Sequence, residues 1–564
     1  MASYTLGIDF GTSSCRSLIV DLSDGREIAE AVYPYPSGQS GVVLAADPDV
    51  ARQEPADYLA GLENTVRSAL LTAAGTIDGF VAAEVVAVGV ATTGSTPIPV
   101  NDTGTALALL PEFSDNLAAK AWLWKDHTAH REAAMITKIA RHTRPEYIDA
   151  CGGTYSAEWF WAKIWHCLNT DRAVFDAAAS WVELCDFLVG QLTGTSSPNE
   201  LKRSITAAGH KAMYSKSWGG LPDTEFLATL APELAELRGR LYDSAAQTTE
   251  IAGFVTGDWA ERTGLKAGIP VAVGHFDAHA AGIAAGARVG VFVKVMGTST
   301  CDVTVIEEKD GSVLPNIPGM CGVVRDSMIP GKTSIEAGQS AVGDIFNWFA
   351  ENFLGDGEAL EDVSEQAAKL TPGEHGLLAL DWFNGNRSVL IDQRLTGAII
   401  GLTLSTKPHH VFQALVEATA FGARRIVEAI EASGNPLKNI VAAGGLPSQA
   451  PWILQVYANA LGREIVTSRT ILGSALGAAI VAAVASGEFE TVEHAQNVLV
   501  HYNDVPYRPD LVATARYDRL YVEFVFIHDA FAVDGPLGRV MKNLLTIRDE
   551  ATRTLLTKET TRAR

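Results

Sequence analysis

The sequence has few cysteines and no apolar stretch long enough for a membrane span. Its 564 residues include six cysteines, and no two of them form a CxxC pair. This spacing argues against a zinc site or a disulfide framework and is typical of buried thiols in a reducing compartment. The longest apolar run, Ile471 to Ser486, is short of the roughly 20 residues that a span needs and is interrupted by Gly473 and Gly477. We expect a buried helix there.

Positive charge is also scarce. The chain has 44 basic and 66 acidic residues, which gives a formal net charge of −22. This balance argues against nucleic acid or an anionic membrane as the main partner, but not against ATP, which local donors and Mg²⁺ can hold. The first strand begins before an apolar leader could fit, so we expect a soluble cytoplasmic protein.

A Walker A phosphate loop is missing as well. Gly331-Lys332-Thr333 looks like the end of such a loop, but position 326 is Asp where the motif requires Gly. Any phosphate site must therefore be built from other residues.

The length of the chain predicts two large domains, because one hydrophobic core rarely serves so many residues. Glycines at 282, 286 and 290 mark the expected boundary. We therefore predict an N-terminal domain over residues 1–286 and a C-terminal domain over 287–564.

The first residues predict a hairpin that can bind phosphate. Tyr4–Phe10 reads as a buried strand, Gly11–Ser14 as a tight turn and Cys15–Asp21 as the returning strand. Glycine allows close approach of a phosphate, and the Thr and Ser of the turn supply donors. Asp9 could hold a hydrated Mg²⁺ and Arg16 could contact phosphate oxygens. The alternative is an ordinary hairpin with a polar turn.

A second copy of this hairpin favours the phosphate interpretation. Val291–Met296 reads as a strand, Gly297–Asp302 as a turn and Val303–Ile306 as a returning strand. The pattern Gly-Thr-Ser-x-Cys occurs in both turns, which indicates a duplicated fold with one phosphate turn in each half. The arrangement resembles the actin-like superfamily. We therefore predict an α/β protein of two actin-like (ribonuclease H-like) domains, with a nucleotide and sugar cleft between them.

Two further strands end in polar groups. Val85–Val90 precedes the polar loop Ala91–Pro97, and carboxyl ends of strands are where α/β sheets place ligand contacts. A plain turn is the alternative. Pro270–Phe276 precedes Asp277, which begins a small-residue helix through Ala285. Asp277 could be a general base or only a helix N-cap.

Other segments are more ambiguous. Trp122–His127 combines aromatic rings with charged groups, as suits a sugar, whereas Tyr155–Trp165 has the spacing of a core helix. Ala207–Lys211 reads as a loop, and by itself Lys211 would be solvated. Glu336, by itself, reads as the cap of the helix that follows it.

The last third of the chain predicts an adenosine site and a tail. His409–Ala432 reads as a long helix, and Ile440–Ala443 reads as a strand followed by a double-glycine turn. Adjacent glycines would let the backbone lie flat against a base and ribose. Residues after about 487 read as a polar tail of strands and helices.

Together these segments resemble the FGGY family of carbohydrate kinases, and within it the branch that acts on L-ribulose. The resemblance spans roughly residues 4 to 530. Besides the two hairpins, Asp277 and the double-glycine turn, it rests on Thr92–Pro97, Leu123–Ala129, Ser156–Lys163, Ala208–Lys211 and Glu336–Ala341. One position departs: members of that branch often carry Asp where this chain has Ala91, which could shift the choice of substrate.

The resemblance implies a role for each matching residue. Asp277 would be the catalytic base and Asp9 the acid near Mg²⁺. The sugar would be held by Thr93, Gly94, Asp126, Lys211, Asp277 and Glu336. ATP would be held by Thr12, Ser13, Arg16, Gly297, Thr298, Gly444 and Gly445.

The sequence thus predicts ATP-dependent, Mg²⁺-assisted phosphorylation of the terminal C5 hydroxyl of a ketopentose, with L-ribulose as the first choice, in arabinose catabolism. The alternatives are a kinase for another pentulose, a pentitol or glycerol, or a non-catalytic ATP-binding sugar sensor. The expected partners are the sugar and ATP, without nucleic acid or membrane, and homodimerisation is left open.

Overall fold

The computed structural model describes residues 3–307, 314–355, 359–532 and 535–562. Its N-terminal sequence forms the predicted hairpin from β1 (Tyr4–Phe10) and β2 (Ser14–Asp21), which pair antiparallel with Asp9 opposite Arg16. All seven residues of β1 are buried, as expected for a central strand. The Gly11 N–H donates to the Ser14 carbonyl oxygen at 3.0 Å and closes the turn.

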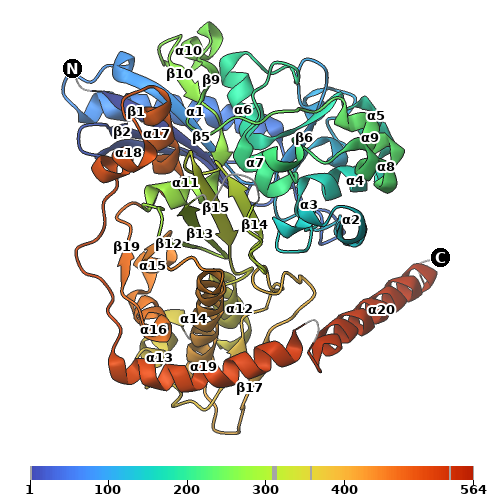
Figure 1. Cartoon of the computed structure of the whole chain (residues 1–564), viewed down its shortest axis with the longest axis vertical. Helices are drawn as coiled ribbons and strands as arrows, with labels where there is room; N and C mark the ends of the chain where they lie inside the picture. Colours follow the sequence, from blue (N-terminus) through green and yellow to red (C-terminus); the bar gives the residue numbers. More distant parts are fainter. Residues whose placement is uncertain (1–2, 308–313, 356–358, 533–534, 563–564) are drawn as a thin grey trace. The chain divides into compact units, whose positions relative to one another are not determined.

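The hairpin belongs to a seven-stranded sheet with the order β3-β2-β1-β5-β10-β9, in which β11 also pairs with β5 (Figure 1). Strands β1 and β5 are parallel, so their carboxyl ends meet at the same edge of the sheet. The other strands are β3 (Glu27–Pro34), β5 (Val85–Thr92), β9 (Ile251–Phe254), β10 (Pro270–Ala272) and β11 (His275–Phe276).

The Ala- and Gly-rich segment near residue 480 forms the predicted buried helix, α17 (Gly473–Ala485). It packs against β1, β5 and α11 (Asp277–Ala284) at very short range. A Cβ atom added to Gly7 would lie 1.8 Å from the Ala475 carbonyl oxygen, and one added to Gly477 would lie 1.9 Å from the Ala280 carbonyl oxygen. Small residues are therefore required on both sides of this contact.

A second sheet of six strands contains the predicted second hairpin. Its order is β14-β15-β13-β12-β18-β19. The strands are β12 (Val291–Met296), β13 (Thr300–Glu307), β14 (Gly322–Arg325), β15 (Lys332–Ala337), β18 (Asn439–Ala443) and β19 (Ile465–Thr467). The Gly297 N–H donates to the Ser299 carbonyl oxygen at 2.9 Å, which closes the turn as in the first hairpin.

The chain divides into two compact units, each built from several segments. The first contains residues 1–293, 303–336 and 468–502, and the second contains 294–302, 337–467 and 503–564. These two units are defined by contacts in space. The domains predicted above, 1–286 and 287–564, are instead defined by a single boundary along the sequence.

In the first unit, the aromatic stripe around residue 160 is core, as predicted. Tyr155, Trp159, Phe160 and Trp161 are all buried in one cluster. The helices of this unit are α1 (Pro55–Thr76), α2 (His130–Thr143), α3 (Pro145–Asp149), α4 (Phe160–Thr170), α5 (Arg172–Ala177), α6 (Leu184–Thr193), α7 (Ile205–Lys211), α8 (Thr224–Leu230), α9 (Pro232–Arg238), α10 (Gly257–Thr263), α11, α17 and α18 (Val492–Leu499). Short strand pairs are formed by β4 (Arg52–Gln53) with β7 (Ala121–Trp122) and by β6 (Pro97–Val100) with β8 (Ser180–Glu183).

The second unit is mainly helical outside its strands. Its helices are α12 (Gly343–Phe353), α13 (Leu360–Ala367), α14 (Pro408–Ala432), α15 (Leu446–Gln449), α16 (Pro451–Leu461), α19 (Leu511–Phe531) and α20 (Gly538–Arg562). Strands β16 (Leu378–Leu380) and β17 (Ala398–Ile400) form a separate pair. The predicted long helix and double-glycine turn are confirmed by α14 and by the junction of β18 with α15.

Four local predictions are wrong. Residues 207–211 lie in helix α7 rather than in a loop, and Glu336 lies in strand β15 rather than at a helix cap. Trp122 is 1% exposed and packs in the core, so its ring does not present a face to a sugar. In the described residues after 487, the tail is built from α18, α19 and α20 without the expected strands.

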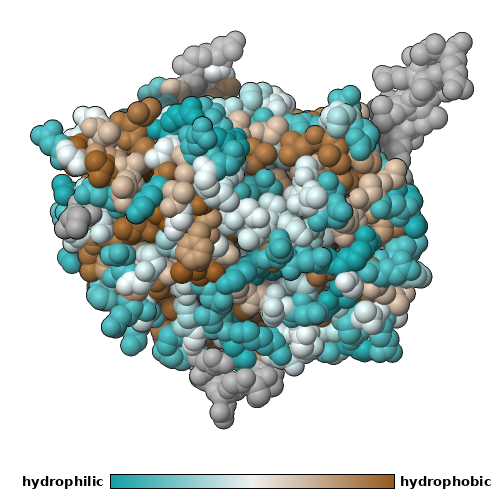
Figure 2. All heavy atoms as spheres, turned by 90° about the horizontal axis from the view of Figure 1, so that it is seen from above, coloured by the Kyte–Doolittle hydropathy of each residue, from teal (hydrophilic) through white to brown (hydrophobic). Residues whose placement is uncertain are grey.

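Within the part of the chain that the structure describes, no helix combines the length and apolarity of a membrane span. Figure 2 shows hydrophilic and hydrophobic residues interspersed over one face of the molecule.

Candidate active site

Asp277 stands at the junction of β11 and α11, at the carboxyl-end edge of the first sheet. It is the first residue of α11, and Phe276 occupies the N-cap position. One carboxylate oxygen accepts from the Ala278 N–H at 2.7 Å. Loss of hydration raises the pKa of Asp277 to about 8, and the negative charge of Asp9 adds to this effect. A half-buried carboxyl with a pKa near neutrality can accept a proton from a substrate.

Asp9 lies near the end of β1 and is 7% exposed. Burial raises its pKa to about 6, while Arg16, its cross-strand partner, opposes the rise. Its Oδ1 atom is buried without a hydrogen-bond partner among the described residues. A buried carboxylate oxygen without a donor, close enough to Asp277 for the two charges to repel, fits a divalent cation at this edge.

Lys211 and Glu336 form a buried ion pair. The Lys211 Nζ atom donates to Glu336 Oε1 at 2.7 Å, and the two residues are 5% and 7% exposed. Burial opposes the charge on Glu336, but Lys211 and hydrogen bonds from two histidines hold the pKa of Glu336 well below its usual range. The Lys211 Nζ atom also lies 5.4 Å from the centre of the Trp159 ring. The resemblance assigned these two residues to one site, and the structure brings them into contact.

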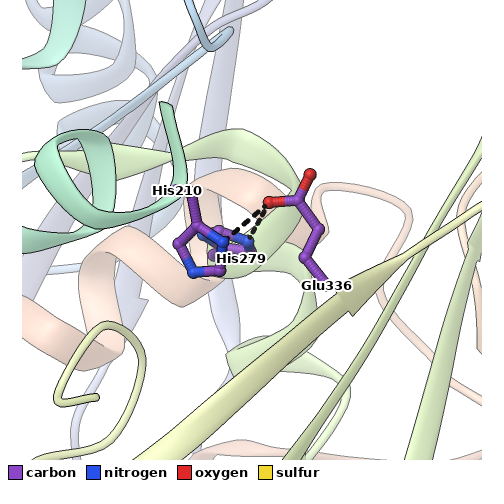
Figure 3. Close-up of side chains that lie close together, drawn as sticks. All are labelled: His210, His279 and Glu336. Carbon is purple, nitrogen blue, oxygen red and sulfur yellow. Dashed lines mark hydrogen bonds and ion pairs between the residues drawn. The ribbon is translucent and has the colours of Figure 1, made fainter. Parts of the chain in front are cut away.

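The two histidines, His210 and His279, were missed by the sequence analysis. Both approach Glu336 Oε2, His279 through Nε2 at 3.0 Å and His210 through Nδ1 at 3.2 Å (Figure 3). Burial, together with the neighbouring His279, lowers the pKa of His210 to about 3, so His210 is neutral. Their positions in the sequence could have identified them, because each histidine lies within two residues of a predicted site residue.

Thr93 and Gly94 follow β5 at the same edge of the sheet. The Thr93 N–H donates to the Phe10 carbonyl oxygen at 3.0 Å, and its hydroxyl lies 3.0 Å from that of Thr96. A Cβ atom added to Gly94 would lie 2.0 Å from the Phe276 ring, so only glycine fits beside the residue that precedes Asp277.

Asp126 is fully buried and engaged by protein groups. Its Oδ2 atom accepts from the Ala51 N–H at 2.7 Å and pairs with Arg52, and its Oδ1 atom accepts from the Thr128 hydroxyl. These contacts fix the segment around residue 51 against that around residue 128. In this structure the Asp126 carboxylate therefore has a structural role.

Ala91 lies opposite Asp9 in the pairing of β1 with β5. It is fully buried and packs with Ala280 and Ala478, on α11 and α17. The proposed effect of this position on the choice of substrate stays a prediction.

The turn of the first hairpin, which is predicted to contact phosphate, is held in place by side chains from distant segments. Gln53 Nε2 donates to the Thr12 carbonyl oxygen at 2.7 Å, and Trp124 Nε1 donates to the Thr12 hydroxyl at 3.0 Å. Ser13 is exposed and Thr12 and Arg16 are half-buried, as phosphate contacts would be.

The second unit contains a cavity of about 360 Å³. Such a volume lies within the range of small-molecule sites. It is lined by Gly297, Thr298, Gly343, Phe346, Asn347, Leu360, Glu361, Ser364, Phe412, Gly445, Leu446, Ala450 and Ile453. Of the four predicted ATP contacts in the second unit, three are therefore brought together, namely Gly297, Thr298 and Gly445. The fourth, Gly444, has φ +95° and lies against the backbone of Met296, where an added Cβ would be 2.4 Å from the carbonyl oxygen.

A carboxyl with a raised pKa, a buried ion pair, two glycine turns and a cavity whose volume suits a small molecule are the features expected of a small-molecule kinase. The comparisons with known proteins agree. Residues 4–284 match the N-terminal domain of the FGGY family of carbohydrate kinases, and residues 292–486 match the C-terminal domain. The chain therefore belongs to the FGGY family and is a carbohydrate kinase.

Similar proteins include the ribulokinase of Vibrio parahaemolyticus, which is 38% identical over 88% of this chain and 90% of its own length. The ribulokinase of Mycolicibacterium smegmatis is 38% identical over 98% of this chain and 97% of its own. Among solved structures, xylulose kinase from Rhodospirillum rubrum matches with a TM-score of 0.76 at 23% identity, covering 94% of this chain and 99% of that one. The last likeness supports the two-domain fold.

Proposed function

We propose that this kinase transfers the γ-phosphoryl group of ATP to the C5 hydroxyl of L-ribulose. The observation that supports the proposal is that Asp277 lies close enough to Lys211 and Glu336 for their charges to affect its pKa. All three residues belong to the first unit. The choice of L-ribulose is supported by relatives named ribulokinases that align over nearly the whole chain.

The roles follow from the chemistry of each group. Glu336, kept ionised, accepts hydrogen bonds from sugar hydroxyls, and Lys211 donates to a sugar oxygen. Thr93 and Gly94 form a border of the site at the edge of the sheet. Asp126 holds the segments around residues 51 and 128 in position. Asp277 takes the proton of the attacking hydroxyl as its oxygen bonds to the γ-phosphorus and the bond to the ADP oxygen breaks.

The phosphates need charge neutralisation more than covalent chemistry. In our proposal Thr12, Ser13 and Arg16 contact them from the first turn, and Gly297 and Thr298 from the second. Asp9 would hold Mg²⁺, which when bound neutralises phosphate charge. Gly444 and Gly445 would border the adenosine in the cavity of the second unit.

We keep the division into domains 1–286 and 287–564 as part of this proposal, together with a cytoplasmic enzyme of arabinose catabolism. None of the six cysteines, all of which lie in the described residues, forms a disulfide, which is consistent with a reducing compartment. Homodimerisation stays a prediction.

A panel of sugars with coupled detection of ADP tests the proposal. L-Ribulose should give the highest kcat/KM. A higher value with another pentulose, a pentitol or glycerol would replace the substrate while keeping the mechanism. The absence of ADP release with every sugar, from protein that binds ATP, would instead favour the sensor.

A further inference from the structure

Glu336 is the centre of a buried cluster in the first unit. Its Oε1 atom accepts a hydrogen bond from Lys211 Nζ. Its Oε2 atom lies close to His279 Nε2 and His210 Nδ1 (Figure 3). The four residues come from β15, α7 and α11, which are far apart in the sequence. Three of these groups therefore determine the position and charge of a single carboxylate.

Two histidines and a carboxylate could also bind a transition metal, since their ligand atoms lie within 4.8 Å of one another. The ammonium group of Lys211, 2.7 Å from the second oxygen of the same carboxylate, argues against this. A divalent cation beside Lys211 would leave excess positive charge in a buried site. The geometry favours hydrogen bonding to Glu336.

His279 has the more defined geometry of the two histidines. It is 1% exposed, and its Nε2 atom lies 3.0 Å from Glu336 Oε2. Its Nδ1 atom is buried without a hydrogen-bond partner among the described residues. Because Glu336 is an acceptor, this pattern places a proton on His279 Nε2.

The place of His279 in the fold gives this contact its significance. His279 lies two residues after Asp277 in the first turn of α11. Its bond to Glu336 therefore ties the helix that carries the base to the strand that carries the sugar-binding acid. His210 supports the same oxygen from α7, and its own Nε2 atom lies 3.0 Å from the Ser327 hydroxyl.

We propose that His279 is a positioning residue that orients Glu336 toward the sugar and fixes it relative to Asp277. The inference rests on the proposed function, since it assigns Glu336 to the sugar. Removal of the imidazole N–H leaves Glu336 with one fewer donor and with freedom to rotate. Sugar binding should weaken while ATP binding is unaffected.

The test compares two variants of similar size. His279→Gln can place an amide N–H near the position of Nε2, whereas His279→Met fills the space without a donor. We expect His279→Met to raise the KM for L-ribulose about ten- to hundredfold, with a smaller change in kcat and an unchanged KM for ATP. His279→Gln should recover at least half of this loss on a logarithmic scale.

His275 provides a matched control. It is buried in β11, two residues before Asp277, and its ring nitrogens have no hydrogen-bond partner among the described residues. His275→Met removes a buried imidazole from the same segment and should leave the KM for L-ribulose within about threefold. If it raises this KM as much as His279→Met does, the effect is one of packing and the inference is overturned.

Equal KM values for His279→Met and the wild type would also overturn it, as would equal losses in the Gln and Met variants. Two-bond ¹H–¹⁵N spectra of histidine-labelled wild-type protein provide a test that needs no activity. They should show a proton on His279 Nε2, with a resonance that shifts in Glu336→Ala. An Nδ1–H tautomer would refute the proposed contact even if the wild type phosphorylated no pentulose, an outcome that would separately refute the proposed function.

Discussion

Replacement of Asp277 by Asn tests the proposed base most directly. The Asn side chain keeps the size of Asp and can still accept from the Ala278 N–H through its oxygen, so α11 should form normally. It cannot accept the proton of the sugar hydroxyl. General-base catalysis typically contributes 10²–10⁴-fold, so we expect kcat to fall by about that factor.

The same substitution should stabilise the protein. The pKa of Asp277 rises from 3.8 to about 8 on folding, because burial and the charge of Asp9 disfavour the carboxylate. Between these two values the folded state binds a proton that the unfolded state has released, so ionisation of Asp277 costs stability as the pH rises from about 4 to 8. Asn avoids this cost.

The shift would correspond to about 6 kcal/mol at ~1.4 kcal/mol per pKa unit if the carboxyl were fully desolvated. Because Asp277 is half-buried and keeps part of its hydration, we expect a gain of about 1–3 kcal/mol in the free energy of unfolding at pH 8. The gain should largely disappear near pH 4.

Steady-state kinetics with coupled ADP detection and urea unfolding at pH 4 and pH 8 measure both effects on the same preparation. A merely structural role for Asp277 predicts loss of activity together with loss of stability. A variant that keeps more than about a tenth of the wild-type kcat would show that Asp277 is not the base.

Three further predictions follow from the surroundings of this residue. Wild-type kcat/KM should rise with pH through an apparent pKa of about 8. Asp9→Asn removes the second negative charge and should therefore move this midpoint to lower pH. An unmoved midpoint in pH–rate profiles at fixed, saturating Mg²⁺ would show that the two carboxyls do not interact. Lys211→Met should raise the sugar KM and lower the free energy of unfolding by about 3–5 kcal/mol, because Glu336 loses its buried partner. The double variant with Glu336→Gln should recover stability but not sugar use. Full recovery of the sugar KM in the double variant would refute the assignment of these two residues to the sugar. Ala91→Asp should lower the melting temperature, since the new carboxyl would be buried against Ala280 and Ala478 at a cost of about 3 kcal/mol or more. An unchanged melting temperature in a thermal scan would mean that this position borders open space.

The two hairpins could be predicted because their determinants are local. Each consists of a buried strand, a glycine turn and a returning strand within about 20 residues, and the second copy repeats the first. Asp277 was found for the same reason, since a buried strand, an acid and a small-residue helix follow one another directly. The close packing of α17 on β1 required small residues that are visible in the sequence.

The cluster around Glu336 could not be found in this way. Lys211 and Glu336 are separated by 125 positions, and neither has a local sequence signal for burial. A lysine in a polar stretch reads as solvated, and an acid before Ala-Gly reads as a cap, until the partner of opposite charge is known. The resemblance grouped them, but it could not place His279 between the helix of the base and the strand of Glu336.

The same separation explains the error at Trp122. An aromatic residue beside Lys and Asp is compatible with a sugar platform, but the ring lies in the core with the Arg52 guanidinium 3.5 Å from its centre. Arg52 in turn pairs with Asp126, so the charged groups near Trp122 satisfy one another.

Two carboxylates of the site show how the fold assigns different roles to similar side chains. Asp277 forms no ion pair with another described residue, and burial with a neighbouring negative charge raises its pKa to about 8. Glu336 is also buried, but Lys211 and two histidines lower its pKa well below the usual range. An acid that must gain and release a proton needs the first environment, and one that must stay charged to hold hydroxyl groups needs the second. The opposite shifts therefore support Asp277 as the base and Glu336 as the binding group, and an exchange of these roles would require the positive charge of Lys211 to lie beside the other carboxylate.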